Sequence, residues 1–148
     1  MFKRILIATD GSPLSRTAIA TGVELARLSN GTVVGLHARP PMGVVLYGEG
    51  SIMVPPETQA AYKERARAVS GKYLAEVEAS ARQSAVPFEG VDIEDASPSD
   101  AILRTAQSQD CDLIVMASHG RRGLTRVLMG SETQKVLTHA TQPVVVTR

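Results

Sequence analysis

Residues that could bind a phosphate are concentrated in two short segments of the 148-residue sequence. In the first, the carboxylate of Asp10 could hold a divalent cation that neutralises a polyphosphate. The second runs from Gly120 to Gly130. Glycines that lead into a helix leave backbone N–H groups unhindered at the positive end of the helix dipole, which suits an anion. The hydroxyls of Ser131 and Thr133 would add donors, so the pattern predicts a phosphate site.

Both segments directly follow short aliphatic runs that predict β-strands. The runs are apolar at consecutive positions, as from Leu113 to Met116, which is typical of strands buried on both faces of a parallel sheet. Ligands of an open α/β sheet bind beyond the carboxyl ends of its strands, so we expect the residues after the strands to form the site. The predicted strands are Arg4–Thr9, Thr32–Ala38, Phe88–Ile93, Asp112–Ala117 and Pro143–Thr147.

Four helical patterns separate these strands. Serine followed by proline marks a helix start at Ser12 and again at Ser97, and the last helix is expected over Ser131–His139. The second helix, expected over Glu57–Ala85, carries an apolar stripe at helical spacing. Its members are Tyr62, Ala66, Val69, Tyr73, Val77 and Ala81. The alternation predicts an α/β fold: a single doubly wound domain over residues 1–148, with a five-stranded parallel sheet and helices on both faces.

Residues 39–56 form an unusually long connection after the second strand. They hold four of the eight prolines and three of the twelve glycines. Connections of this length inside a compact domain are typically lids, binding loops or interface arms.

Charge and aromatic content exclude several classes of partner. Sixteen Lys and Arg residues against fifteen Asp and Glu give a net charge of +1, which is typical of neither a general nucleic-acid binder nor a membrane-surface protein. Five aromatic residues and no tryptophan are too few for a base-stacking platform. The single cysteine, Cys111, cannot form an internal disulfide, and no targeting or membrane-spanning segment is visible. We therefore expect a soluble cytoplasmic protein.

The glycine segment closely resembles the nucleotide motif of the universal stress proteins, G-x2-G-x9-G-S/T. The matching residues are Ala117-Ser118-His119-Gly120 and, after nine more residues, Gly130-Ser131. The first strand with Asp10 and the ending from Gln142 to Val146 also resemble that family, so the resemblance covers nearly the whole chain. It implies the strand order 3-2-1-4-5 and ATP as the ligand, bound together with Mg²⁺ or Mn²⁺.

Carried over by motif position, the resemblance implies a nucleotide site in the cleft after the first and fourth strands. Asp10 would approach the phosphates through the metal ion, Ala38 would offer backbone contacts to adenine, and Gly130 with its neighbours would grip the terminal phosphates. No residue is expected to be catalytic. The complete expected set is Thr9, Asp10, His37, Ala38, Met116, Ala117, His119, Gly120, Arg121, Gly130, Ser131 and Thr133, with Asp10 as the metal ligand.

Several members of this set have simpler interpretations. Position 117 is Ala where nucleotide-binding members usually have Gly; if its backbone is left-handed, alanine costs about 1–2 kcal/mol and weakens binding without abolishing it. His119 could be a polar loop residue, Arg121 a solvated surface charge, and His37 the end of a buried strand.

These features predict a stress-response protein that binds ATP and acts as a nucleotide-dependent switch or scaffold. Two alternatives remain open: a nucleotide-free dimeric scaffold of the same family, and a slow ATPase. The sequence lacks a P-loop motif, a dinucleotide-binding fingerprint and the paired acids of a phosphorylated receiver domain. Val144, Val145 and Val146 predict an unprotected edge strand, and the resembling family dimerises through this strand, so we expect a homodimer.

Overall fold

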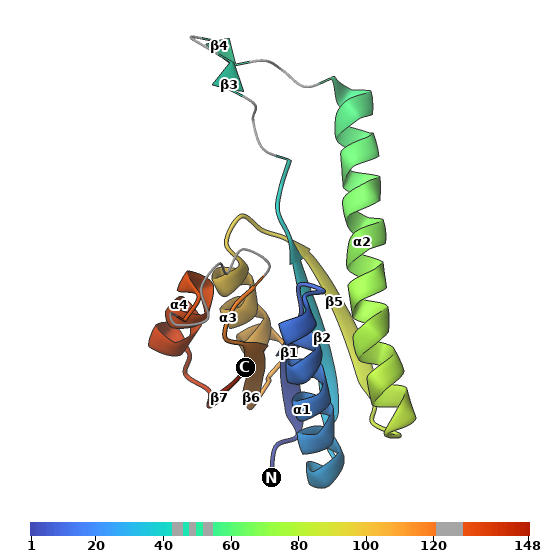
Figure 1. Ribbon diagram of the computed structural model, residues 1–148, viewed down its shortest axis with the longest axis vertical. Helices are drawn as coiled ribbons and strands as arrows, with labels where there is room; N and C mark the ends of the chain where they lie inside the picture. The colour runs from blue at the N-terminus through green and yellow to red at the C-terminus, as the bar shows by residue number, and fades with distance from the viewer. Residues whose placement is uncertain (43–45, 48–49, 52–54, 121–128) are drawn as a thin grey trace.

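The computed structural model describes residues 1–42, 46–47, 50–51, 55–120 and 129–148. Its centre is a five-stranded, all-parallel sheet in the order β5-β2-β1-β6-β7 (Figure 1). Counted along the chain, this is the predicted order 3-2-1-4-5, and each strand boundary lies within one residue of the predicted one. The strands are β1 (Arg4–Ala8), β2 (Thr32–Arg39), β5 (Phe88–Glu94), β6 (Leu113–Ala117) and β7 (Val144–Thr147).

Helices cover both faces of the sheet, which confirms the predicted doubly wound α/β fold (Figure 1). One pair packs on one face and the other pair on the opposite face. In the part of the chain that the structure describes, none of the helices is long and apolar enough to cross a bilayer. The helices are α1 (Pro13–Ser29) and α2 (Pro56–Gln83) on one face, and α3 (Pro98–Ser108) and α4 (Ser131–His139) on the other.

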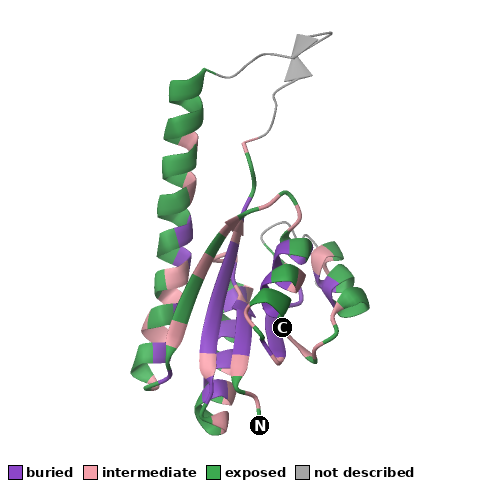
Figure 2. Cartoon of the chain, turned by 180° about the vertical axis from the view of Figure 1, so that it is seen from behind, coloured by how far each residue is buried: buried purple, intermediate pink, exposed green. Residues whose placement is uncertain are grey.

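The core is built from the two faces of the central strands. Ile5 and Ile7 point into the cluster beneath α1 and α2, while Leu6 between them points into the cluster beneath α3 and α4. All three have no exposed surface. Figure 2 shows the interior strands buried along most of their length. Burial on both faces explains why these strands are continuous apolar runs in the sequence.

The two serine-proline starts are N-caps, as predicted. Ser12 Oγ accepts from the Ser15 N–H at 3.2 Å, and Ser97 Oγ accepts from the Asp100 N–H at 3.3 Å. The N–H of Ser97 itself donates to the carboxylate of Asp95, at 2.8 Å. Each cap satisfies an N–H group that the helix cannot pair internally.

Only the second half of the stripe on α2 lies in the core. Tyr73, Val77 and Ala81 are buried as predicted, but Val69 is 44% exposed and Tyr62 is only half-buried. The first half of the helix extends past the sheet, so no strand lies beneath that part of the stripe (Figures 1 and 2). Helical spacing predicted the apolar face correctly but carried no information about where the sheet ends.

The long connection after β2 contains two short strands that the sequence pattern did not predict. β3 (Leu46–Tyr47) and β4 (Gly50–Ser51) pair antiparallel as a two-stranded sheet apart from the main one (Figure 1). The neighbouring residues 43–45, 48–49 and 52–54 lie outside the described part of the chain. The interpretation of this connection as a lid, loop or arm stays a prediction.

Gly11, in the turn after β1, is required by both its backbone and its surroundings. Its φ is +72°, a left-handed conformation that side-chain-bearing residues rarely adopt. A Cβ atom there would lie 2.1 Å from Cε1 of Tyr73, whose ring packs over the turn from α2. This contact fixes how closely α2 approaches the carboxyl end of β1.

We expect Gly11→Ala to destabilise the fold by about 1–2 kcal/mol through its φ and by a further ~1–3 kcal/mol through the clash with Tyr73. The matched control is Gly71→Ala, because Gly71 lies within α2 and its Cβ would meet open space. That change should stabilise the protein by about 0.5–1 kcal/mol. The free energy of unfolding in urea measures both effects. Equal changes at the two glycines would contradict the close contact between Gly11 and Tyr73.

Candidate functional site

The two predicted phosphate-binding segments meet where β1 and β6 end. Asp10 follows β1, and its Oδ1 accepts from the Ser12 N–H at 2.9 Å. Gly120 lies against the same carboxylate, since a Cβ there would be 2.9 Å from Asp10 Oδ2. Residues 110 positions apart in the sequence are thus neighbours at the point where the strand order reverses, which is where ligands bind in such sheets.

The hydroxyl of Thr9 shapes the turn beside this site. It accepts from the Gly11 N–H at 3.2 Å and donates to Ser15 Oγ at 3.2 Å, and the residue is only 5% exposed. The N–H of Thr9 donates to the carbonyl of Leu36 on β2 at 2.9 Å. Thr9 therefore holds the backbone that carries Asp10.

The carbonyl of Ser118 joins the end of β6 to the start of α4. It accepts from the Gly130 N–H at 2.8 Å and from Thr133 Oγ1 at 3.2 Å, and the same hydroxyl lies 3.1 Å from the carbonyl of Ala117. On its other side, the Ser118 N–H donates to the carbonyl of Thr147 at 2.8 Å. These bonds bring Gly120 and Gly130 to one place, as the motif spacing predicts.

The start of α4 offers N–H groups more than hydroxyls. Gly130 is its N-cap, and no side chain caps the helix there. The first N–H groups of a helix have no partner within the helix, so those after Gly130 can receive an anion. Ser131 is exposed, whereas Thr133 is 3% exposed and its hydroxyl already serves the loop carbonyls. A ligand would therefore meet the backbone of Thr133 before its side chain.

Gly130 also leaves room that a side chain would fill. A Cβ atom at this position would lie 3.2 Å from the carbonyl oxygen of Ser118 and 3.5 Å from Cα of His119. The close approach of two backbone segments explains the glycine.

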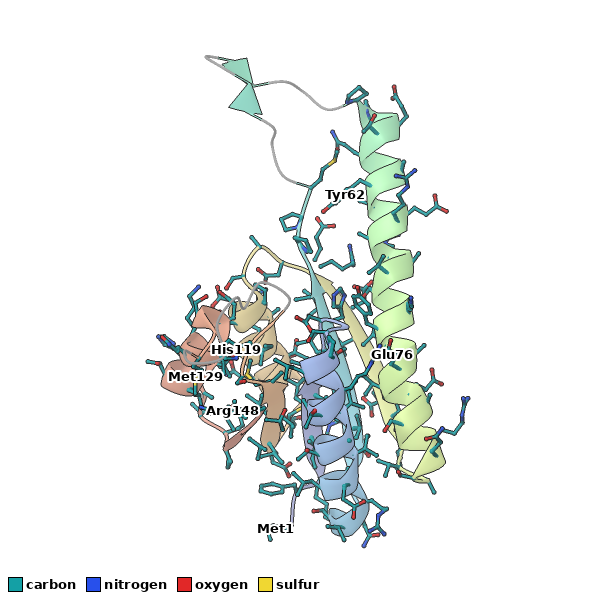
Figure 3. The ribbon with its side chains drawn as sticks, in the orientation of Figure 1. Met1, Tyr62, Glu76, His119, Met129 and Arg148 are labelled. Carbon is teal, nitrogen blue, oxygen red and sulfur yellow. The ribbon has the colours of Figure 1, made fainter. Side chains whose placement is uncertain are left out.

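His119 presents a buried nitrogen beside this helix start. Its Nδ1 lies 3.0 Å from Ser118 Oγ, while its Nε2 is buried and has no hydrogen-bond partner among the described residues. Figure 3 shows His119 and Met129 beside α4. Leaving a buried polar atom unpaired costs about 1–3 kcal/mol, so a ligand atom that pairs with Nε2 would gain stability.

Ala117 does not have the left-handed backbone that would make alanine unfavourable. It is the last residue of β6, and the positive-φ residues other than glycine in the described part of the chain are Asn30, Ala85 and Asp110. Ala117 and Met116 are both buried, at 9% and 6% exposure. The backbone strain that a left-handed alanine would carry at position 117 is therefore absent.

The side chain of His37 lies on the opposite face from Met116. His37 is 8% exposed on the α2 side of β2, with Nδ1 2.9 Å from Ser70 Oγ and its ring 5.1 Å from that of Tyr73 at an edge-on angle of 78°. Met116 belongs to the cluster beneath α3 and α4. The structure thus places Ala38, but not the imidazole of His37, toward the face that carries the glycine motif. Arg121 lies outside the described residues.

Glu132 is a site residue that the sequence interpretation missed. Its Oε2 accepts from the Ser99 N–H at 2.8 Å, and its Oε1 pairs with Lys135 Nζ at 2.9 Å. It therefore joins the first turn of α4 to the first turn of α3. Burial acts to raise the pKa of Glu132, but the hydrogen bonds from Lys135 and Ser99 outweigh it and hold the pKa below its usual value. An acidic residue in a helix's first turn was the only available signal, and it is a common one.

Other features at a distance add no ligand chemistry. Burial raises the pKa of the Cys111 thiol to about 11, so it is protonated at neutral pH and is no redox nucleophile. Open grooves of about 220 Å³ beside Arg16 and Glu76, and about 420 Å³ beside Met42 and Tyr62, run along α2 away from the cleft. Among the described residues, no group of three His, Cys, Asp or Glu side chains could hold a metal ion.

Comparison with known proteins gives one consistent family. The model for the universal stress protein family matches residues 1–148. A universal stress protein of Thermus aquaticus is 33% identical over 151 residues, which cover the whole of both chains. The solved structure of the protein MJ0577 has a TM-score of 0.84 at 22% identity and covers 99% of this chain and 96% of its own. At that identity the structural likeness shows the fold.

Three other solved structures of this fold are described with a nucleotide. One universal stress protein, in complex with cAMP, has a TM-score of 0.74 at 20% identity and covers 99% of this chain and 97% of its own. The universal stress protein from Archaeoglobus fulgidus, in complex with dAMP, has a TM-score of 0.66 at 22% identity and covers 99% of this chain and 98% of its own. A universal stress protein family protein from Arabidopsis thaliana, with AMP bound, has a TM-score of 0.67 at 18% identity and covers 97% of this chain and 90% of its own.

The bonds of Glu132 predict a pH dependence of stability. Because its pKa is lowered in the fold, its contribution is present above the ordinary value of 4.5 and is lost as the pH falls through the lower folded value. Glu132→Gln should therefore destabilise the protein at about pH 7 and make progressively less difference as acid protonates Glu132. Urea unfolding at decreasing pH measures this. The control, Glu64→Gln on the exposed half of α2, should change little at any pH, and a Glu132 effect independent of pH would contradict the prediction.

Proposed function

The chain belongs to the universal stress protein family, and we propose that it binds ATP, with Mg²⁺ or Mn²⁺, where β1 and β6 end. Residues 1–148 then act as one adenine-nucleotide-binding unit in the cytoplasm. Binding changes the state or the partners of the protein, so that it serves as a stress-response switch or scaffold. Slow hydrolysis of the bound ATP is the alternative outcome, and phosphate release would detect it.

An uncapped helix start beside an unpartnered histidine nitrogen carries this proposal. The N–H groups after Gly130 and the Nε2 of His119 are polar groups that the described fold leaves without a partner of their own. Both lie at the end of the sheet where Asp10 and Gly120 meet. Fixed donors at a helix start favour a negatively charged group, and a phosphate would satisfy several of them together.

Each part of the nucleotide is assigned to its own group of residues. Asp10 holds the metal ion, which neutralises the phosphate charge when bound. The backbone of Ala38 meets adenine, and residues 116–120 meet the ribose and the first phosphates. The backbone N–H groups from Ser131 to Thr133 hold the terminal phosphates. The adenine nucleotides named for three solved relatives support the choice of base.

We further propose a homodimer formed through β7. This strand is at the edge of the sheet, paired with β6 alone, and Val144, Val145 and Val146 are half-buried. The carbonyls of Pro143 and Thr147 bond to β6, so in a parallel ladder the N–H groups of Val144 and Val146 point outward. An open edge of this kind pairs readily with a second chain. In the alternative function, that of a nucleotide-free scaffold, the same dimer forms without a bound nucleotide.

Release of nucleotide from the purified, denatured protein, followed by calorimetric titration with Mg²⁺-ATP, tests the ligand. We expect an adenine nucleotide in the released fraction and measurable binding. Gly130→Glu should weaken binding by at least about tenfold, because it fills the space beside Ser118 and adds a negative charge. Gly71→Glu, with the same charge change in open space on α2, should leave binding within about twofold. No released nucleotide and no ATP binding would leave the scaffold as the surviving function.

Sedimentation tests the dimer. We expect the wild-type protein to be dimeric at micromolar concentration and Val146→Pro to be monomeric, since proline removes one outward N–H and keeps the bonds to β6. Val146→Thr keeps that N–H and a branched side chain, so it should remain dimeric. A monomeric wild type, or a dimeric Val146→Pro, would contradict pairing through β7.

A further inference from the structure

Within the described part of the chain, the last three residues of β2 are paired with a strand on one side only. β1 ends at Ala8, opposite Leu36, and the last bond between the two strands runs from the Thr9 N–H to the Leu36 carbonyl. On the other side, residues 37–39 continue in register with residues 92–94 of β5. Under the proposed function, the side of Ala38 without a strand is where adenine binds. A strand end with one neighbour needs another support to stay in place.

That support is a group of polar side chains on the α2 face, which we call the polar ladder. Its members are His37, Arg39, Ser70, Asp92 and Glu94. Arg39 pairs with Asp92 Oδ1 at 2.5 Å and with Glu94 Oε2 at 3.3 Å, and its side chain is 9% exposed. Ser70 of α2 donates to Asp92 Oδ1 at 2.8 Å. His37 and Arg39 stand on either side of Ala38, so the ladder fixes the backbone before and after it.

Ser70 determines the direction of the hydrogen bonds. Its hydroxyl has one proton, which goes to the carboxylate of Asp92, since an ionised carboxylate can only accept. The Nδ1 of His37, 2.9 Å away, must therefore donate to Ser70 Oγ. Ser70 has no exposed surface, so no water replaces its hydroxyl if it is removed. The Nδ1–H of His37 would then lose this acceptor, and Asp92 Oδ1 would lose one donor while keeping its pair with Arg39.

We propose that the polar ladder positions Ala38 for the adenine base, and that Ser70 is the positioning residue on which it depends. This inference rests on the proposed function. The groups proposed to bind the phosphates are positioned by a separate set of hydrogen bonds between the end of β6 and the start of α4, and none of these bonds involves α2. Loosening the ladder should therefore weaken the hold on the base and spare the hold on the phosphates.

The difference between Mg²⁺-ATP and Mg²⁺-tripolyphosphate isolates the base, because tripolyphosphate has the phosphates alone. Calorimetry should show ATP binding the wild-type protein more tightly than tripolyphosphate. Ser70→Ala should weaken the affinity for Mg²⁺-ATP by about tenfold and leave the affinity for Mg²⁺-tripolyphosphate within about twofold of wild type. Arg39→Lys keeps the positive charge but not the geometry that pairs with two carboxylates. It should weaken the affinity for Mg²⁺-ATP by about threefold and again spare the affinity for Mg²⁺-tripolyphosphate.

Val77→Ala is the matched control, because Val77 is a fully buried residue of α2 on the same face and no member of the ladder. It should lower stability to urea and leave both affinities within about twofold of wild type. Equal losses of ATP and tripolyphosphate in Ser70→Ala, or unchanged ATP binding, would overturn the ladder's role while the proposed function stands. A wild-type protein that binds neither ligand overturns the proposed function and this inference with it.

Discussion

The candidate site depends on hydrogen bonds at one carbonyl group, that of Ser118. This oxygen receives the Gly130 N–H and the Thr133 hydroxyl, and so it brings the start of α4 back to the end of β6. The closure carries His119 and the open helix start to the strand ends together. Because glycine stands at position 130, the two backbone segments can approach closely enough to form these bonds. This closure therefore places His119 and the first N–H groups of α4, which are the donors that we propose for a phosphate.

The helices on the two faces of the sheet support the residues of the candidate site in different ways. On the face of α3 and α4, Glu132 joins the two helix starts by accepting from Ser99, so that the α3 start is occupied while the α4 start stays open. On the face of α1 and α2, Tyr73 packs over Gly11 and Ser70 bonds to His37. The long helix α2 thus contacts both the turn after β1 and the end of β2. Residues of α2 thereby support the strand end at which we propose that adenine binds.

Much of the fold could be predicted from the sequence because its signals are local. Runs such as Leu113 to Met116 predict buried parallel strands, and Ser12 with Pro13 predicts a helix start. The strand order and the nucleotide site came from the family resemblance. The hairpin of β3 and β4 was missed because its strands are two residues long, too short for any periodicity. Val69 belongs to the predicted apolar stripe and yet is exposed, because helical spacing shows which side of a helix is apolar, not how far the sheet beneath it extends.

The sequence by itself determined the α/β class and the strand boundaries to within one residue, and the family resemblance implied the strand order that brings Asp10 to the glycine motif. Only the tertiary structure decided that His37 faces α2, that Ala117 is not left-handed, that Glu132 bonds to the start of α3 and that Ser70 bonds to His37. The reason is physical. Helix and strand formation follow largely from neighbours along the chain, whereas the burial of a helix face and the partner of a polar side chain depend on elements that meet only when the sheet has formed.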